Sequence, residues 1–269
     1  MNNKTTQILL TNDDSIHSPG LWAAAEALDT LGYVHVVAPR DQHSGAGRSM
    51  PIHTSGIIEK MPLTVNGKDW EVYSVDGSPG QSVLHGIYDV IQATPDLVVS
   101  GINYGENVGS GVTVSGTVGA ALEAATLGIP ALAVSMQTGR EHHFSLSQDV
   151  DFSTATYFTH LIAEWMLDSD LPEDVDIIKV DIPFDATPDT PMVLTRQSRQ
   201  RYYLPKPAVR TSVAEPGPVG YDVLEDFSIL EPNSDLYALL VEKKVSVTPI
   251  SLDLTSRTDF GQLDALLRR

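Results

Sequence analysis

Short apolar runs alternate with segments of helical periodicity through the first half of the chain, and this alternation limits the possible folds more than any other feature. We predict strands at residues 8–11, 34–38, 96–100, 131–135 and 176–181, and helices at residues 19–31, 80–91, 117–127 and 152–167. Asn66-Gly67 within the alternating residues 63–75 predicts a β-hairpin. Strands separated by helices are typical of a parallel sheet covered by helices. The sequence therefore predicts an α/β fold, a Rossmann-like three-layer sandwich with a mostly parallel sheet.

The pattern changes after residue 195, where periodicity is weak and prolines recur at Pro205, Pro207, Pro216, Pro218 and Pro232. We interpret this stretch as an extended arm or hairpin that serves as an oligomer contact or a lid, because loops of this length are uncommon without a role. A long surface loop is the alternative. We expect an α/β core at 1–195, a protruding arm at 196–244, and a C-terminal strand and helix at 245–269 that return to the core or to a partner subunit.

Composition excludes several classes of function. The chain has no cysteine, so disulfides, zinc–thiolate sites and thiol chemistry are excluded. A net charge of −18 disfavours binding to nucleic-acid polymers or anionic membranes. The N-terminus has no apolar signal core, and no apolar run approaches the roughly 20 residues of a membrane helix. We therefore expect a cytoplasmic, soluble protein.

Two adjacent carboxylates follow the first predicted strand, in the sequence Asn12-Asp13-Asp14. Ser18 and Pro19 then read as an N-cap and a first-turn proline. The Asp pair thus lies beyond the carboxyl end of a strand, where ligands bind in open α/β sheets. Adjacent carboxylates repel each other unless a proton or a cation intervenes, and Mg²⁺ or Mn²⁺ is the simplest occupant. A turn-and-cap role for both Asp residues is the alternative.

Neutral oxygen donors and small residues follow other predicted strands. Ser44 and Asn103 each follow an apolar run, and such neutral donors would complete the shell of a hard ion without adding charge. Ser115, Gly116 and Thr117 open a predicted helix, where free backbone N–H groups and the helix dipole favour an anion. These three residues therefore read as a phosphate cradle, with an ordinary helix cap as the alternative.

Together these segments resemble the survival protein SurE family of metal-dependent 5′/3′-nucleotidases. The resemblance spans nearly the whole chain, and it rests on residues 8–14, 36–39 with 44–45, 99–103, 107, 115–121, 130–135 and 245–249. It implies hydrolysis of nucleoside monophosphates by a cytoplasmic, acid-phosphatase-like phosphomonoesterase that binds one Mg²⁺ or Mn²⁺ per subunit. It also implies a homodimer or homotetramer in which the arm exchanges between subunits.

The resemblance also assigns roles to individual residues. It implies that Asp13, Asp14, Ser44 and Asn103 are the metal ligands. It implies that Ser115, Gly116 and Thr117 contact the phosphate, with Asn12 and Asn107 close by. We accordingly assign catalysis to Asp13, Asp14 and Asn12, and substrate binding to Asn107, Ser115, Gly116 and Thr117.

The chain departs from the family pattern at two informative places. Ser15 replaces the usual glycine after the Asp pair, and a turn with positive φ would then cost about 1 kcal/mol. Lys179 and Asp181 replace the asparagines of an Asn-Val-Asn-Val-Pro-like strand, which adds a charge pair. No base-reading motif is evident. Tyr104, His142 and His143 are the polar or aromatic candidates near the site, although we expect the two histidines to be solvated loop residues.

The expected mechanism is attack by metal-activated water, with Asp13 or Asp14 accepting the proton. A covalent aspartyl-phosphate route is disfavoured, because enzymes of that kind show Asp-x-Asp after the first strand. The rival hypothesis is a receiver-like, Mg²⁺-binding regulator controlled by phosphorylation. It requires a third aspartate, for which Asp76 is the candidate, and it leaves residues 115–117 without a purpose.

Overall fold

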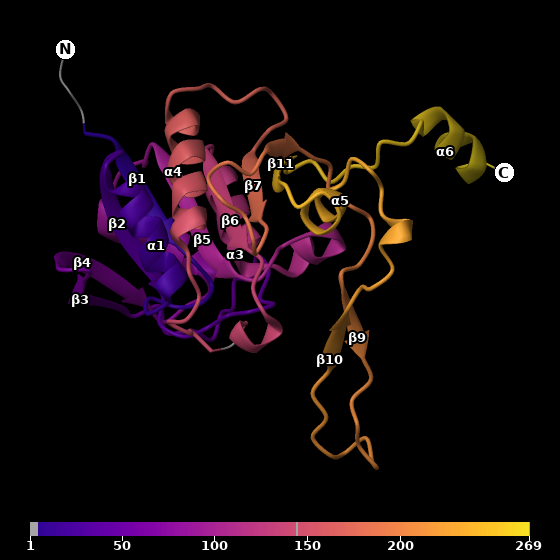
Figure 1. Ribbon diagram of the computed structural model, residues 1–269, viewed down its shortest axis with the longest axis horizontal. Coiled ribbons are helices and arrows are strands. Elements are labelled where there is room, and N and C mark those ends of the chain that lie inside the picture. Colours follow the sequence, from indigo (N-terminus) through magenta and orange to yellow (C-terminus); the bar gives the residue numbers. More distant parts are fainter. Residues whose placement is uncertain (1–4, 144, 269) are drawn as a thin grey trace.

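A nine-stranded sheet forms the centre of the structure, a computed structural model that describes residues 5–143 and 145–268 (Figure 1). The strand order is β3-β4-β2-β1-β5-β6-β7-β11-β8. Pairing is parallel from β4 to β7 and between β11 and β8, whereas β3–β4 and β7–β11 are antiparallel. The strands are β1 (Gln7–Thr11), β2 (Tyr33–Pro39), β3 (Ile58–Val65), β4 (Lys68–Val75), β5 (Leu97–Tyr104), β6 (Ala131–Met136), β7 (Ile177–Ile182), β8 (Met192–Leu194) and β11 (Val245–Ile250).

Helices cover both faces of this sheet. One layer contains α1 (Pro19–Leu28) and α4 (Ser153–Leu167), and the other contains α2 (Pro79–His85) and α3 (Gly116–Ala125). Alternate residues of β1 face the two apolar cores on opposite sides of the sheet, since Ile8 and Leu10 pack with the first layer and Leu9 packs with the second. The predicted three-layer α/β sandwich with a mostly parallel sheet is confirmed.

Local sequence signals explain several element boundaries. Asn66 and Gly67 have φ of 48° and 79° and join β3 to β4, so the predicted hairpin is confirmed. The predicted helix 80–91 is α2 followed by a π-helix, Gly86–Ile91, in which a Cβ at Gly86 would lie 2.7 Å from Leu9 Cδ1. Short 3₁₀ helices span Gly109–Val114, Arg140–His142 and Phe227–Ile229.

The segment after β8 forms a hairpin that stands away from the sheet (Figure 1). Its strands are β9 (Tyr203–Lys206) and β10 (Gly220–Val223), and residues 207–219 form its tip. A small apolar cluster anchors its base against the body of the fold and includes α5 (Asp235–Leu240). The chain then enters the main sheet as β11, and α6 (Phe260–Leu267) lies apart from the sheet with every residue exposed.

Within residues 5–143 and 145–268, no helix has the length and apolar character needed to cross a membrane.

Candidate active site

Asp13 and Asp14 follow β1 after one residue, Asn12, and are both buried, with exposures of 4% and 1%. Because β2 and β5 flank β1 in parallel, the loops that leave all three strands meet at the same edge of the sheet. The predicted position of the Asp pair, beyond the carboxyl end of a central strand, is the one observed.

The Asp13 carboxylate faces the N-terminus of α3. Thr117 Oγ1 donates a hydrogen bond of 2.6 Å to Asp13 Oδ1. Burial raises the pKa of Asp13 to about 6, although the Thr117 hydroxyl and the backbone N–H groups of Thr117 and Gly116 oppose this increase. The approach is close, since a Cβ on Gly116 would lie 2.7 Å from Asp13 Oδ2. The start of α3 therefore already stabilises one anion, as the sequence predicts for a phosphate.

Asp14 is held by two donors, one from the loop after β2 and one from the end of β5. Gln42 Nε2 donates to Asp14 Oδ1 at 2.9 Å, and the Tyr104 backbone N–H donates to Asp14 Oδ2 at 3.3 Å. Burial and then the charge of Asp13 raise the pKa of Asp14 to about 8. Gln42 was not predicted as a site residue, and its only signal in the sequence is its position two residues before Ser44.

The neutral donors predicted to join the Asp pair lie in those same two segments, Ser44 in the loop after β2 and Asn103 near the end of β5. Asn103 precedes Tyr104, and its Nδ2 donates to Gly105 O at 2.7 Å, which occupies the amide nitrogen and leaves Oδ1 as an acceptor. Ser44 is exposed and follows His43, whose backbone N–H donates to Asp13 O at 2.7 Å. The segments that carry both predicted donors are therefore hydrogen-bonded to the Asp pair.

The donor chemistry fits a hard divalent cation. Two buried carboxylates with raised pKa values lie side by side, and a divalent cation would relieve their repulsion. Asn12 Nδ2 donates to Ser15 O, and Asn12 Oδ1 is a buried acceptor without a partner among the described residues. Within residues 5–143 and 145–268, no three histidine, cysteine, aspartate or glutamate side chains are grouped to hold a metal. An ion here would thus combine the Asp pair with neutral oxygens.

The predicted phosphate-binding residues gather around the start of α3. Asn107 Nδ2 donates to Ser135 Oγ at 2.8 Å and to Thr117 Oγ1 at 3.4 Å, so Asn107 adjoins the Thr117–Asp13 contact. Ser115 Oγ accepts the Val118 N–H at 3.1 Å, as in an ordinary helix cap. The Ser115 hydroxyl therefore caps the helix, and the backbone and Thr117 are the groups that face Asp13.

Other candidates lie elsewhere or have partners. Asp76 follows β4, two strands from β1, and accepts a hydrogen bond from Arg40 Nη2 at 3.1 Å, so it does not join the Asp pair as a receiver-like site requires. The expectation that both loop histidines are solvated is wrong for His143, which is buried and bonded to the Tyr221 hydroxyl at 3.1 Å. The hairpin packs on this loop and covers His143.

Ser15 adopts φ of +94° immediately after the Asp pair, as the comparison with the family pattern anticipated. Its side chain makes only a weak contact, in which Oγ accepts the His17 N–H at 3.4 Å. We expect Ser15→Gly to raise the free energy of unfolding by about 1 kcal/mol, because glycine adopts positive φ without a Cβ clash. Denaturant unfolding would measure this. Ser15→Ala keeps the Cβ and is the control; equal stability of both variants would contradict the strain argument.

The raised pKa values predict that the metal-free protein loses stability as pH rises. Both acids have a pKa near 3.8 when unfolded and about 6 and about 8 when folded, so the folded state binds more protons between about pH 4 and pH 8. For each acid, a difference of one between the folded and unfolded pKa values changes the free energy of unfolding by about 1.4 kcal/mol across this range. In EDTA, the stability of wild type minus that of Asp14→Asn should fall across this range, and Mg²⁺ or Mn²⁺ should reverse the fall. A pH-independent difference in thermal denaturation would contradict this prediction.

Comparison with known proteins gives matches over nearly the whole chain. The model of the survival protein SurE family matches residues 8–204. The chain is 44% identical to a protein named 5′-nucleotidase SurE of Thermococcus gammatolerans, over 97% of this chain and 96% of that protein. It is 43% identical to the 5′-nucleotidase SurE of Archaeoglobus fulgidus, over 94% of each. The crystal structure of the SurE protein from Aquifex aeolicus aligns with a TM-score of 0.76 at 31% identity, over 97% of this chain and 99% of that one.

Proposed function

Because the chain belongs to the survival protein SurE family, we propose that it hydrolyses nucleoside 5′- and 3′-monophosphates to nucleoside and phosphate. The coarser activity, that of a phosphomonoesterase hydrolase, follows from its 5′-nucleotidase relatives. The observation that carries the proposal is the buried Asp13–Asp14 pair, of which Asp13 faces the N-terminus of α3. A cytoplasmic location, as expected from the sequence, belongs to the same proposal.

The proposal includes one Mg²⁺ or Mn²⁺ per subunit, with Asp13, Asp14, Ser44 and Asn103 as ligands. When bound, the ion supplies positive charge for the phosphate oxygens and acidity for the attacking water. The raised pKa values of the two carboxyls support this set of ligands. So do two hydrogen bonds from residues next to Ser44 and Asn103: the His43 N–H donates to the backbone oxygen of Asp13, and the Tyr104 N–H donates to Asp14 Oδ2.

The protein's own groups would bind the phosphate and move the proton. The backbone N–H groups at the start of α3 donate hydrogen bonds to the phosphate oxygens as their charge redistributes. The Thr117 hydroxyl and the Asn107 amide join them by turning from Asp13 and from Thr117, which are their acceptors in the metal-free protein. One carboxylate of the Asp pair accepts the proton of the attacking water. Asn12 holds the turn, because its Nδ2 donates to Ser15 O at 3.0 Å.

Weak discrimination among bases is part of the proposal. Tyr104, a base-reading candidate, is buried; its ring packs edge-on against Phe152 at 4.9 Å, and its hydroxyl donates to Ser147 O. His143 is enclosed by the tyrosines of the hairpin. Specificity for one base requires placed polar partners, and these candidates are already engaged. We therefore expect rates on the common nucleoside monophosphates to differ only modestly.

A phosphate-release screen tests the function. Nucleoside 5′- and 3′-monophosphates, sugar phosphates and short polyphosphate are each assayed with Mg²⁺, with Mn²⁺ and in excess EDTA. We expect continuous release from both nucleotide classes, with loss of activity in EDTA. Much faster turnover of sugar phosphates would overturn the nucleotide assignment. No turnover with either metal, together with single labelling by acetyl phosphate, would favour the receiver-like regulator.

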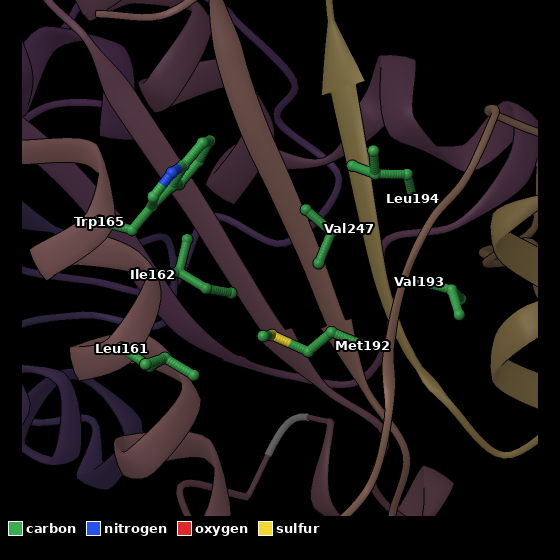
Figure 2. Close-up of a pocket in the computed structure, with 7 residues that line it drawn as sticks. All are labelled: Leu161, Ile162, Trp165, Met192, Val193, Leu194 and Val247. Carbon is green, nitrogen blue, oxygen red and sulfur yellow. The ribbon is translucent and has the colours of Figure 1, made fainter. Parts of the chain in front are cut away.

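We also propose a homodimer or homotetramer in which a second copy of this chain covers exposed apolar surfaces. On the hairpin tip, Val209 and Val213 are 99% and 91% exposed. A groove of about 400 Å³ lies toward the β8 edge of the sheet, between α4 and the β8–β11 pair (Figure 2). It is lined by Leu161, Ile162, Trp165, Met192, Val193, Leu194 and Val247. Exposed apolar surface of this extent commonly marks protein–protein contacts.

Replacing residues 207–219 with an Asn-Gly turn should shift the protein toward a smaller assembly. This change keeps β9, β10 and the apolar cluster at the base of the arm, and it removes only the exposed tip. Light scattering at micromolar concentration measures the molar mass, with circular dichroism to confirm that the variant folds. A wild-type chain that is already monomeric under these conditions would contradict the proposed assembly.

A further inference from the structure

Three charged side chains are fully buried behind the candidate site. Lys179 and Asp181 lie on β7, and Asp235 begins α5. Lys179 Nζ contacts the Asp181 carboxylate and lies 3.3 Å from Asp235 Oδ2. Burial alone would lower the pKa of Lys179, but the two carboxylates outweigh burial and raise it. A charged lysine therefore faces two acidic side chains inside the core.

Stability alone does not explain this cluster. Replacing a buried ion pair with apolar residues of similar volume is often neutral or stabilising, because removing charges from water is unfavourable. Lys179 and Asp181 occupy alternate positions of β7, so they lie on the same face of the sheet as Ile177. Ile177 packs in the apolar core on that face. The charges must therefore provide something that apolar side chains at these positions would not.

What the cluster provides is acceptors for one loop. The Asn107 backbone N–H donates to Asp181 Oδ1 at 2.7 Å, and the Gly109 N–H donates to Asp235 Oδ2 at 3.0 Å. Both N–H groups belong to the segment that connects β5 to α3. Asp235 Oδ1 also accepts the Ser198 N–H at 2.9 Å, so the base of the arm is attached to the same cluster.

From Asn107, hydrogen bonds continue to the Asp pair. Asn107 Nδ2 lies 3.4 Å from Thr117 Oγ1, and Thr117 Oγ1 donates to Asp13 Oδ1 at 2.6 Å. The geometry points to a positioning role for Lys179, Asp181 and Asp235: the cluster fixes the backbone of residues 107–109 so that the Asn107 amide is aimed at the bound phosphate. This inference rests on the proposed function in one respect, the contact between Asn107 and phosphate.

Two double variants isolate the acceptor from the charge. Lys179→Met/Asp181→Asn and Lys179→Met/Asp181→Val remove the same two charges, but only the Asn variant keeps a carbonyl oxygen for the Asn107 N–H. Loss of one hydrogen bond in a buried site changes an equilibrium constant by about tenfold. We expect the KM for a nucleoside monophosphate to rise about tenfold in the Val variant relative to the Asn variant, with a smaller change in kcat. Similar KM values in the two folded variants would overturn the inference.

Amide hydrogen exchange gives a readout that does not depend on turnover. Exchange in residues 105–114 should be faster in the Val variant than in the Asn variant, whereas Glu231→Gln should leave it unchanged. Glu231 Oε2 accepts the Ser198 hydroxyl at 2.6 Å, so that control perturbs the base of the arm without affecting the acceptor of Asn107. Equal exchange in the two double variants would refute the positioning role. If wild type hydrolyses no nucleotide, the proposed function fails, and the exchange experiment still decides this inference.

Asp235→Asn provides a second test if the Val variant does not fold. Gly109 and Ser198 donate to different oxygens of Asp235, and asparagine keeps only one of these two oxygens, so one of the two N–H groups loses its acceptor. Exchange in residues 105–114 or at the base of the arm should increase in this variant. Protection equal to wild type at both places would overturn the inference.

Discussion

Asp13→Asn and Asp14→Asn should each lower kcat/KM for a nucleoside monophosphate by about a thousandfold or more, since each removes a charged oxygen ligand and a candidate proton acceptor. The fold should survive, because asparagine has nearly the same shape and both carboxyls have raised pKa values in the metal-free protein. Steady-state phosphate release with Mg²⁺ or Mn²⁺ measures the loss, and circular dichroism confirms that the variants fold.

Asp176→Asn is the matched control for these two variants. Asp176 lies just before β7, at the opposite end of that strand from Asp181. Its Oδ2 accepts the Leu252 N–H at 2.6 Å. The control should retain wild-type kcat/KM. If a folded Asp13→Asn variant keeps more than about a tenth of wild-type activity, the assignment of metal and catalysis to the Asp pair is wrong.

Gly116→Ala should lower kcat/KM by about a hundredfold, because the new methyl group would displace Asp13 and a misplaced catalytic group is costly to the rate. An ideal Cβ on Gly116 would lie 2.7 Å from both Cβ and Oδ2 of Asp13, a shorter separation than side-chain contacts allow. Helix propensity favours alanine at this position, so the effect is expected on activity more than on helix formation.

Gly111→Ala is the control within the same connection. A Cβ on Gly111 meets no atom within 4 Å, so the activity of the Gly111→Ala variant should equal that of wild type. Comparing KM with kcat for Gly116→Ala separates weakened phosphate binding from slowed chemistry. Wild-type activity in a folded Gly116→Ala variant would contradict the close packing of α3 against Asp13.

The candidate site was partly readable from local sequence because its residues follow strand ends. Asn12 to Asp14, Ser44 and Asn103 all come after apolar runs, and parallel strands bring their carboxyl ends to one edge. Ser15 was recognisable as a strained position, and φ of +94° agrees with that expectation. The role of each residue in metal binding or catalysis stays a prediction.

Other features depended on contacts between distant segments. Gln42 reaches Asp14 and the His143 backbone, and no local pattern links three loops in this way. His143 belongs to a loop with a polar sequence, yet the hairpin buries its ring against Tyr203 and Tyr221. A side chain's exposure depends on what covers it, and here the covering residues lie about 60 to 80 positions away in the chain.

Periodicity and turn chemistry were enough to predict the α/β class, the five central strands β1, β2, β5, β6 and β7, the hairpin turn at Asn66–Gly67 and the place of the Asp pair, because these follow from interactions between near neighbours in the chain. Tertiary structure alone decided that Thr117 bonds to Asp13 and that Lys179 and Asp181 form a buried cluster with Asp235. The physical reason is separation: Thr117 lies 104 positions from Asp13, and such groups meet only when the sheet brings their strand ends together.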